Sequence, residues 1–347
     1  MKRRRKIFLN IVIAVIVFWG ALAIFPRSLG MAGENPLVIE RNTRPLLIAH
    51  GGGNLEFPDN TLEAFYHAFH IDQHVMMETD VSITKDGVVI LSHDTTLDRK
   101  TKLIEAPIIE INYSDLIDDE IDFGYHNNVS PKSNGFNVTG EWIQYRNHHG
   151  NTVTPLDVVY PFGVEPRHET IFLATTLDEL IKAFPNNYIN VEIKQSGETG
   201  LMALSAVIAL MDSLNETYDT YSRIVLASFH RDIYQQMVEI KKTSHPNLQY
   251  SPEFNGVVTF FVLHLLLLDV FFFEKVSVLQ VPPSQYGLSL STKHFINTAH
   301  RHNIAVHYWT IDDPDEMRRL IENGADGIMT NKPTLLKEVY DDVFGTE

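Results

Sequence analysis

Short apolar runs alternate with longer amphipathic stretches along most of the chain. The apolar runs are rich in β-branched residues and are bounded by Gly, Pro, Asn or Asp, as is typical of buried strands. The pattern predicts strands at 46–50, 75–81, 88–92, 188–193, 223–229, 248–251, 276–281, 305–311 and 327–330, and helices at 60–71, 200–214, 231–242, 292–302 and 314–323. Strands joined by crossover helices imply a parallel sheet, and this many strands favour a closed TIM (β/α)8 barrel of the α/β class over an open sheet. One of the nine candidates must be peripheral, either the strand after the Asp86-Gly87 turn or the strand at Gly327.

The N-terminal segment has a different pattern. Residues 1–6 carry five positive charges, whereas residues 7–25 carry none and are almost wholly apolar. At a rise of about 1.5 Å per residue, the apolar stretch is just long enough to cross a bilayer core of about 30 Å. We therefore predict a basic cytoplasmic tail at 1–6, a single-pass transmembrane anchor at 7–25, a linker at 26–44 and a barrel at 45–340 outside the cytoplasm, on the cell membrane. A cleaved signal peptide is the alternative, with cleavage near Ala32-Gly33.

The region 95–171 interrupts the alternation of strands and helices. It is rich in Asn, Asp, His, Gly and Pro and is too long for an ordinary loop. We predict a small inserted subdomain beside the mouth of the barrel. Such a subdomain either shapes substrate access or is a variable surface appendage.

A second apolar segment lies at 257–273. Its sequence, VVTFFVLHLLLLDVFFF, is about as apolar as a membrane span but shorter than the roughly 20 residues that a span needs. A second crossing would also place the last strands of the barrel on the wrong side of the membrane. We predict a barrel helix whose outer face, with Phe260, Leu265 and Phe272, rests on the lipid bilayer. The alternative is a buried helix covered by the insertion or by another subunit.

Charge and cysteine content exclude several functions. The chain has 28 Lys and Arg, five of them in residues 1–6, against 44 Asp and Glu, so the remainder carries a net charge of about −21. Nucleic acid is not expected as a partner, because its phosphate backbone is bound by basic surfaces. The chain contains no cysteine, which excludes thiolate catalysis and cysteine-based zinc sites.

The candidate chemistry lies on the predicted strands. Glu78 and Asp80 are two positions apart on a strand, so both side chains project from the same face. Two carboxylates held together repel each other unless a cation lies between them, and hard oxygen ligands suit Mg²⁺ or Ca²⁺. His50 and His93 follow apolar runs on either side and could move protons near neutral pH. This combination suits the cleavage of a phosphodiester.

A later strand repeats the arrangement. Glu192 and Lys194 are again two positions apart, with Asn190 on the same face. A carboxylate and an ammonium in an apolar strand are costly unless that face opens onto a polar site. Phe229 and Trp309 also lie at or near strand ends, where they either pack in the core or form a wall of the substrate cleft.

An ordered series of motifs closely resembles the glycerophosphodiester phosphodiesterases. The motifs are Ile48-Ala49-His50-Gly51-Gly52, the run from Pro58 to Phe65, Glu78-Thr79-Asp80-Val81, Lys85-Asp86-Gly87, Leu91-Ser92-His93-Asp94, Asn190-Val191-Glu192-Ile193-Lys194, Ala227-Ser228-Phe229, Tyr308-Trp309-Thr310-Ile311 and the run from Gly324 to Thr330. The resemblance extends over roughly 46–336 and omits the insertion and the segment around 255–275. So many motifs in one order are a strong signal, where any one alone would be weak.

The resemblance implies a TIM barrel that uses a divalent metal to hydrolyse glycerophosphodiesters to an alcohol and glycerol phosphate. It implies that Glu78, Asp80 and Glu192 hold the metal, that His50 and His93 are the acid/base pair, and that Lys194 contacts the phosphate. We assign His50 as the base and His93 as the acid. An apolar helix at 257–273 that rests on the bilayer would suit a lipid-derived substrate such as a lysophospholipid.

Two departures from the family pattern concern phosphate binding. The family usually has Arg directly after the first His, whereas this chain has Gly51, and Asp59 replaces the usual Glu. Glycine cannot make the bidentate contacts of arginine, but the backbone N–H groups of Gly51 and Gly52 could bind phosphate oxygens instead. Neither departure affects the acidic residues or the histidines.

Two other functions are compatible with the sequence. A lysophospholipase D or a sphingomyelinase D-like phospholipase would use the same histidines and metal, and the products would distinguish it. A non-enzymatic, membrane-anchored binding protein would have to lack a metal ligand or a histidine, and here all five residues are present.

Overall fold

A computed structural model describes residues 2–40, 43–127 and 142–345. Part of the predicted insertion, residues 128–141, therefore lies outside the described residues, as do Met1 of the predicted tail and residues 41–42 of the predicted linker.

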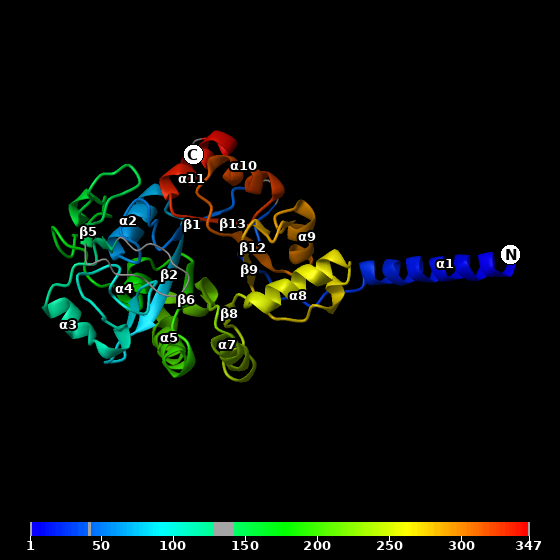
Figure 1. Ribbon diagram of the computed structural model, residues 1–347, viewed down its shortest axis with the longest axis horizontal. Coiled ribbons are helices and arrows are strands. Elements are labelled where there is room, and N and C mark those ends of the chain that lie inside the picture. Colours follow the sequence, from blue (N-terminus) through cyan, green and yellow to red (C-terminus); the bar gives the residue numbers. More distant parts are fainter. Residues whose placement is uncertain (1, 41–42, 128–141, 346–347) are drawn as a thin grey trace.

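Eight parallel strands form a nearly closed barrel, which confirms the predicted TIM architecture (Figure 1). In their order around the barrel they are β8 (Gln249–Tyr250), β7 (Ile224–Ala227), β6 (Ile189–Ile193), β2 (Met76–Ile83), β1 (Leu46–His50), β13 (Gly327–Thr330), β12 (Ala305–Tyr308) and β9 (Val278–Val281). Between the two end strands, the N–H of Ser277, just before β9, donates to the carbonyl of Tyr250 in β8 over 3.1 Å.

The peripheral strand is the one after the Asp86-Gly87 turn. This strand, β3 (Val89–Leu91), pairs antiparallel with β2 and lies off the barrel. Gly87 has a φ of +83°, which a tight turn between two antiparallel strands requires. The other candidate, β13, is a full member of the barrel between β1 and β12.

Helices connect the strands and cover the outside of the barrel. They are α2 (Leu62–Ile71), α4 (Leu177–Ala183), α5 (Gly197–Tyr218), α6 (Thr220–Arg223), α7 (Arg231–Thr243), α8 (Phe254–Leu265), α9 (Lys293–Arg301), α10 (Pro314–Asn323) and α11 (Pro333–Phe344). Side-chain caps fix several starts: Thr61 accepts from the Ala64 N–H at α2, and Asp313 accepts from the Asp315 and Glu316 N–H groups at α10. The sequence pattern did not predict the short helix α4 or the C-terminal helix α11.

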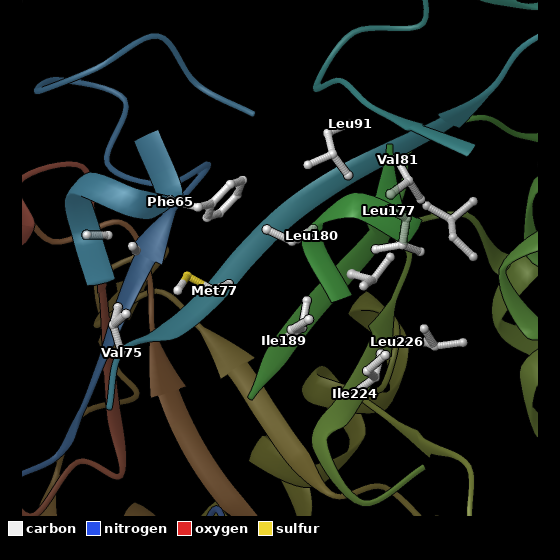
Figure 2. Packing of buried hydrophobic residues seen from close by; sticks show 14 of the residues in the cluster. Phe65, Val75, Met77, Val81, Leu91, Leu177, Leu180, Ile189, Ile224 and Leu226 are labelled. Atoms are coloured by element: carbon white, nitrogen blue, oxygen red, sulfur yellow. The ribbon is translucent and has the colours of Figure 1, made fainter. Parts of the chain in front are cut away.

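Alternation along β2 separates two layers of the core. Met77 and Val81 point outward into a cluster that includes Phe65 of α2 and Leu180 of α4 (Figure 2). Met76 points inward and packs inside the barrel with side chains from other strands, namely Ile48, Val225, Val278, Ala305 and Met329. Since Glu78 and Asp80 continue the inward series, the same alternation aims both carboxylates into the barrel.

The segment expected as a linker, 26–44, packs against the barrel over much of its described length. Leu37 is fully buried in the inner cluster. The side-chain amide of Asn35 donates to the Ser277 carbonyl over 2.8 Å, and the Ile39 N–H donates to Asp326 over 2.8 Å. These contacts hold residues 35–39 to the barrel just before its first strand.

Between β3 and α4, the described residues contain little regular structure. Their elements are η1 (Ile108–Glu110), α3 (Tyr113–Asp118), the antiparallel pair β4 (Tyr125–Asn127) and β5 (Trp142–Gln144), and η2 (Pro155–Asp157). The Tyr145 hydroxyl donates to the Asn54 carbonyl, and the His148 N–H donates to the Leu55 carbonyl, each over 2.8 Å. Both acceptors lie in the loop after β1, at the end of the barrel that carries the candidate site.

Two helices of the described chain are long and apolar enough to cross a membrane. In α1 (Lys2–Ile24), no part of the apolar span Arg3–Leu22 is buried, so it could cross a bilayer, and a signal peptide also fits. The other, α5, packs on the barrel through buried side chains such as Leu204 and Val207, which is the pattern of a core helix.

The segment 257–273 does not form the single helix that the sequence predicted. The helix α8 ends at Leu265, Leu267 adopts a left-handed φ of +56°, and the short helix η3 (Asp269–Phe271) follows. The prediction for its faces was also partly wrong: Phe260 and Phe272 are 0% and 1% exposed, whereas Leu265 is 56% exposed. An unbroken run of apolar residues has no periodicity that could assign its faces.

Candidate active site

Strand register brings the acidic residues together. In β1, β2 and β6, His50 lies beside Glu78, and Asp80 lies beside Glu192. One carboxylate oxygen from each of Glu78, Asp80 and Glu192 lies within 4.8 Å of the others. Spacing within one strand predicted the pair Glu78 and Asp80, and the family resemblance added Glu192. The register between strands places the three together.

Burial gives the cluster unusual electrostatics. Burial, reinforced by the negative charge of Asp80, raises the pKa of Glu78 to about 7. Burial also raises the pKa of Glu192, although the Lys194 ammonium opposes this shift. The Lys194 Nζ lies 3.0 Å from Asp80 Oδ1 and 2.9 Å from Glu192 Oε1. Lys194 therefore offsets part of the negative charge but not all of it.

The donor set fits a hard divalent cation. Asp80 Oδ1 is buried and lacks a hydrogen-bond partner of acceptable geometry, although it lies close to the lysine ammonium. Three carboxylates around one point are the oxygen ligands that Mg²⁺ or Ca²⁺ takes in proteins. A cation here would satisfy the Asp80 oxygen and relieve the repulsion that raises the pKa of Glu78.

Asn60 holds Asp80 in place. Its amide nitrogen donates to Asp80 Oδ2 over 3.0 Å, and its carbonyl oxygen accepts from the Asp80 N–H over 3.1 Å and from the Thr79 hydroxyl over 2.7 Å. Asn60 adopts a left-handed φ of 57°, which asparagine tolerates better than most residues. The motif Pro58-Asp59-Asn60 predicted only the start of a helix, so this supporting role was missed.

A chain of side chains orients His50. The His50 Nδ1 lies 2.6 Å from Asn331 Oδ1, and the Asn331 amide nitrogen donates to Asp312 Oδ2 over 2.7 Å. Because the Asn331 nitrogen is committed to Asp312, its oxygen faces the ring and His50 Nδ1 carries the proton. Burial lowers the pKa of His50, but the Glu78 charge and the Asn331 hydrogen bond outweigh it and raise the pKa overall. The Nε2 atom lies 3.9 Å from Glu78 Oε2.

His93 has a carboxylate partner. Its Nδ1 lies 2.8 Å from Asp94 Oδ1, and this hydrogen bond raises the pKa of His93. Arg99 Nε donates to Asp94 Oδ2 over 2.5 Å, and Arg99 also pairs with Asp59 over 3.0 Å. Burial acts to raise the pKa of Asp94, but His93 and Arg99 hold it below its usual value, so the carboxylate stays charged. The Asp59 that replaces the family's Glu therefore belongs to the support of His93.

The glycines after β1 make other contacts than those expected. The Gly51 N–H donates to Glu78 Oε2 over 2.9 Å, and the Gly52 N–H donates to the Ala49 carbonyl over 3.1 Å. Gly52 has a φ of +86°, and a Cβ there would lie 2.7 Å from the Ala64 Cβ. These contacts do not support phosphate binding by the Gly51 and Gly52 N–H groups. Gly52 is instead explained by the tight turn, and Gly51 by the hydrogen bond that holds Glu78 in place.

Seven of the ten predicted site residues line one large cavity of about 790 Å³, whereas Asp80, Gly51 and Gly52 do not. Its lining includes His50, Glu78, His93, Glu192, Lys194, Phe229 and Trp309. The Phe229 and Trp309 rings meet edge to face with centroids 6.0 Å apart, and Phe229 is 58% exposed. Of the two interpretations of Phe229, this placement favours a wall of the cleft over the core, while Trp309 both lines the cleft and packs on the inner cluster.

A TIM barrel with a carboxylate cluster, a lysine and two oriented histidines defines a class of hydrolase that acts on phosphoric diesters. The Glycerophosphoryl diester phosphodiesterase family model matches residues 50–335. The chain belongs to this family and is a phosphoric diester hydrolase, as its sequence motifs indicated.

Curated relatives match along most of their length. A glycerophosphodiester phosphodiesterase of Caldanaerobacter subterraneus is 23% identical over 84% of this chain and 96% of its own. The lysophospholipase D GDPD1 of Rattus norvegicus is 25% identical over 84% of each chain.

Solved structures share the fold. An Oleispira antarctica phosphodiesterase in complex with the product sn-glycerol-3-phosphate has a TM-score of 0.57 and 18% identity, over 86% of this chain and 97% of its own. A glycerophosphodiester phosphodiesterase of Thermotoga maritima has a TM-score of 0.54 and 20% identity, over 86% of this chain and 99% of its own.

Proposed function

We propose that the protein hydrolyses glycerophosphodiesters to an alcohol and glycerol phosphate, with a divalent metal and with His50 and His93 as the proton-transfer pair. One observation carries the proposal: two histidines, each with its Nδ1 bonded to an oxygen acceptor, line the cavity that also contains Glu78 and Glu192. Each ring then presents Nε2 as the atom free to exchange a proton.

The acidic cluster and Lys194 bind the charged centre of the substrate. Glu78, Asp80 and Glu192 would hold Ca²⁺ or Mg²⁺, which would neutralise the phosphodiester and the charge that develops on its oxygens. Lys194 lies between the carboxylates and the cavity: its ammonium pairs with Asp80 and Glu192, and its side chain also lines the cavity. Its ammonium can therefore contact a phosphoryl oxygen without losing its partners.

The two histidines divide the proton transfers. His50 Nε2 takes the proton from the attacking oxygen, which belongs either to water or to the glycerol 2-hydroxyl, as the new O–P bond forms. The O–P bond to the departing alcohol breaks, and His93 Nε2 gives that oxygen a proton. Attack by water gives glycerol phosphate directly. Attack by the 2-hydroxyl gives a five-membered cyclic phosphate, which a water molecule then opens to glycerol phosphate with the two histidines in exchanged roles. Asp94 suits His93 to the acid role, because a carboxylate partner stabilises the imidazolium. Asn331 is neutral and leaves His50 better suited to the base role.

A lysophospholipase D activity is the second candidate. It breaks the same type of bond with the same groups, and two observations favour it: a named lysophospholipase D among the relatives and the size of the cavity beyond the catalytic residues. A sphingomyelinase D-like activity would differ only in the lipid backbone. We further propose that substrates are lipid-derived and reach the site at a membrane surface.

We also propose that α1 anchors the protein in the cell membrane, with residues 1–6 in the cytoplasm and the barrel outside. The support is the unburied apolar span Arg3–Leu22 and the basic residues at its start. Residues 95–171 would form the inserted subdomain, and 45–340 the phosphodiesterase domain.

The test uses the purified full-length protein with glycerophosphocholine and a monoacyl glycerophosphocholine, in the presence of Ca²⁺, Mg²⁺ or a chelator. Release of choline from either substrate, abolished by the chelator and restored by one metal, supports the proposal. Identification of the phosphorylated product distinguishes the two activities. Choline release that persists in excess chelator would contradict the role of the acidic cluster.

A further inference from the structure

The active-site cavity extends far beyond the catalytic groups. Its volume of about 790 Å³ is in the upper part of the range of small-molecule sites, about 300–1,000 Å³. Apolar side chains of α8, including Val258, Val262 and Leu265, form one wall of the extension. Leu288, in the hairpin of β10 (Ser284–Gln285) and β11 (Leu288–Ser289), also lines it and is 50% exposed. We call the four side chains Val258, Val262, Leu265 and Leu288 the apolar wall.

The stability of the barrel does not account for the apolar wall. The helix α8 is held by its opposite face, where the buried Phe260 packs against Phe272 and Phe295 with ring centroids 4.9 and 5.5 Å away. Val258, Val262 and Leu265 recur at helical spacing and remain 40%, 45% and 56% exposed. A contiguous apolar surface left open to water next to a catalytic centre indicates a binding site.

A small glycerophosphodiester is too short to cover this surface. The acidic cluster, Lys194 and the two histidines account for its phosphate, and its glycerol and headgroup carry no long apolar chain. Building on the proposed function, we infer that the apolar wall binds the single acyl chain of a monoacyl glycerophosphodiester lipid, taken from a bilayer. The phosphate would lie at the catalytic groups, with the chain between α8 and the β10–β11 hairpin.

The surroundings of α8 indicate that the lipid substrate comes from the bilayer. Exposed apolar side chains continue past the cavity at Leu266, Leu267, Phe271 and Phe273, which are 54%, 56%, 49% and 65% exposed. Figure 1 shows α1 leaving the molecule at the end where α8 lies. A membrane-spanning α1 would thus hold these side chains near the lipid.

Specific contacts attach the residues just after α1 to the barrel near α8. Arg27 Nε lies 2.9 Å from Asp269 Oδ2, which joins the chain just after α1 to η3. Lys275 Nζ donates to the Ser28 hydroxyl over 2.8 Å, and the Gly30 N–H donates to the His302 carbonyl over 2.7 Å. The anchor and the exposed apolar surface are therefore attached to each other by several bonds.

The chain-length dependence of the wild-type enzyme is the first test. Full-length protein in nanodiscs is assayed with glycerophosphocholine and with its 1-hexanoyl, 1-octanoyl and 1-decanoyl derivatives as monomers. We expect kcat/KM to rise about fourfold for each methylene that enters the apolar wall. Cleavage of the unacylated diester without any effect of chain length overturns the acyl site and leaves the proposed function standing. No cleavage of any substrate overturns both.

A matched pair of variants locates the site. Leu265 lines the cavity and Leu266 does not, although the two are equally exposed. We expect Leu265→Asn to lower the ratio of kcat/KM for the octanoyl substrate to that for the unacylated diester by about tenfold, and Leu266→Asn to keep the wild-type ratio. Leu288→Asn tests the hairpin side of the apolar wall, with the same expected loss. An equal ratio in all three variants overturns the assignment.

Two further experiments test whether the substrate carries a single acyl chain and whether the substrate comes from a bilayer. Dihexanoyl glycerophosphocholine cleaved as well as the monoacyl form would overturn the single-chain site. The variant Phe271→Asn/Phe273→Asn, outside the cavity, should lower cleavage of a palmitoyl lysolipid in vesicles several-fold more than cleavage of the hexanoyl monomer. Equal effects on both substrates would overturn the bilayer source.

Discussion

His50 and Asn331 come from opposite ends of the sequence, and the His50 Nδ1 lies 2.6 Å from the Asn331 amide oxygen. The amide cannot turn over without also losing its 2.7 Å bond to Asp312. Asn331 therefore selects the tautomer of His50 in which Nε2 is free to accept a proton.

We expect Asn331→Ala to lower kcat about 10- to 100-fold, the range typical of groups that orient a reactive side chain. The hydrogen bond raises the pKa of His50, so its loss should also move the lower limb of the pH–rate profile to lower pH. Asn112→Ala, at a partly exposed position just before α3, serves as the control. An unchanged profile with a lower rate would indicate a purely structural role.

Replacing either histidine should separate catalysis from metal binding. We expect His50→Ala and His93→Ala each to lower kcat about 10²- to 10⁴-fold, with metal affinity by calorimetry changed little. His74→Ala is a suitable control, because that side chain is 85% exposed and lies before β2, at the end of the barrel away from the site. Full activity in His93→Ala would contradict the assignment of His50 and His93 as the proton-transfer pair.

Much of the fold and of the site could be predicted from the sequence, because the patterns that indicate them lie within short segments of the chain. Alternation placed Glu78 and Asp80 on one face of a strand, and the observed register then set Asp80 beside Glu192. The strand predictions succeeded for the same reason, since buried parallel strands are continuous apolar runs. Only the barrel closure had to be inferred from the number of strands.

The supporting residues could not be predicted because their partners are distant in sequence. Asn60 supports Asp80 across 20 positions, and Asn331 supports His50 across 281. Polar residues in turns give no local signal of such a role. In the same way, nothing in the run 257–273 showed that Phe260 faces the core while Leu265 faces the cavity.

Metal should stabilise the fold through the acidic cluster. We expect Ca²⁺ or Mg²⁺ to raise the Tm of the wild-type protein, because a ligand that binds only the folded state shifts the unfolding equilibrium. Asp80→Asn should abolish most of this increase, since Asp80 Oδ1 is the buried oxygen without a hydrogen-bond partner. Asp178→Asn, on the exposed surface of α4, should retain it. A metal-induced rise of equal size in Asp80→Asn would place the cation elsewhere.

Glu78 should make the metal-free protein sensitive to pH. Burial and the charge of Asp80 raise its folded-state pKa to about 7, above the usual value for the unfolded chain. The folded state then binds the proton more tightly, so the contribution of Glu78 to stability is fully present below the unfolded pKa and is lost as pH rises through about 7.

The measurement is the Tm of wild type and Glu78→Gln between mildly acidic and mildly alkaline pH, in excess chelator. Other carboxylates also titrate, so the expected result is a difference: wild type should lose more stability than the variant as pH rises. Saturating metal should remove the difference, because the cation takes the place of the proton. Parallel curves in chelator would show that Glu78 does not titrate in this range.

The two faces of α8 should differ sharply in their contribution to stability. Phe260 is fully buried between Phe272 and Phe295, so Phe260→Ala should lower the free energy of unfolding by about 3–5 kcal/mol through lost burial and a residual cavity. Leu265, on the face toward the cavity, is 56% exposed, and Leu265→Ala should change the free energy of unfolding by no more than about 0.5 kcal/mol. Chemical denaturation of the full-length protein in mild detergent measures both values. Comparable losses would mean that α8 is covered on both faces, which would leave no open apolar surface beside the catalytic centre.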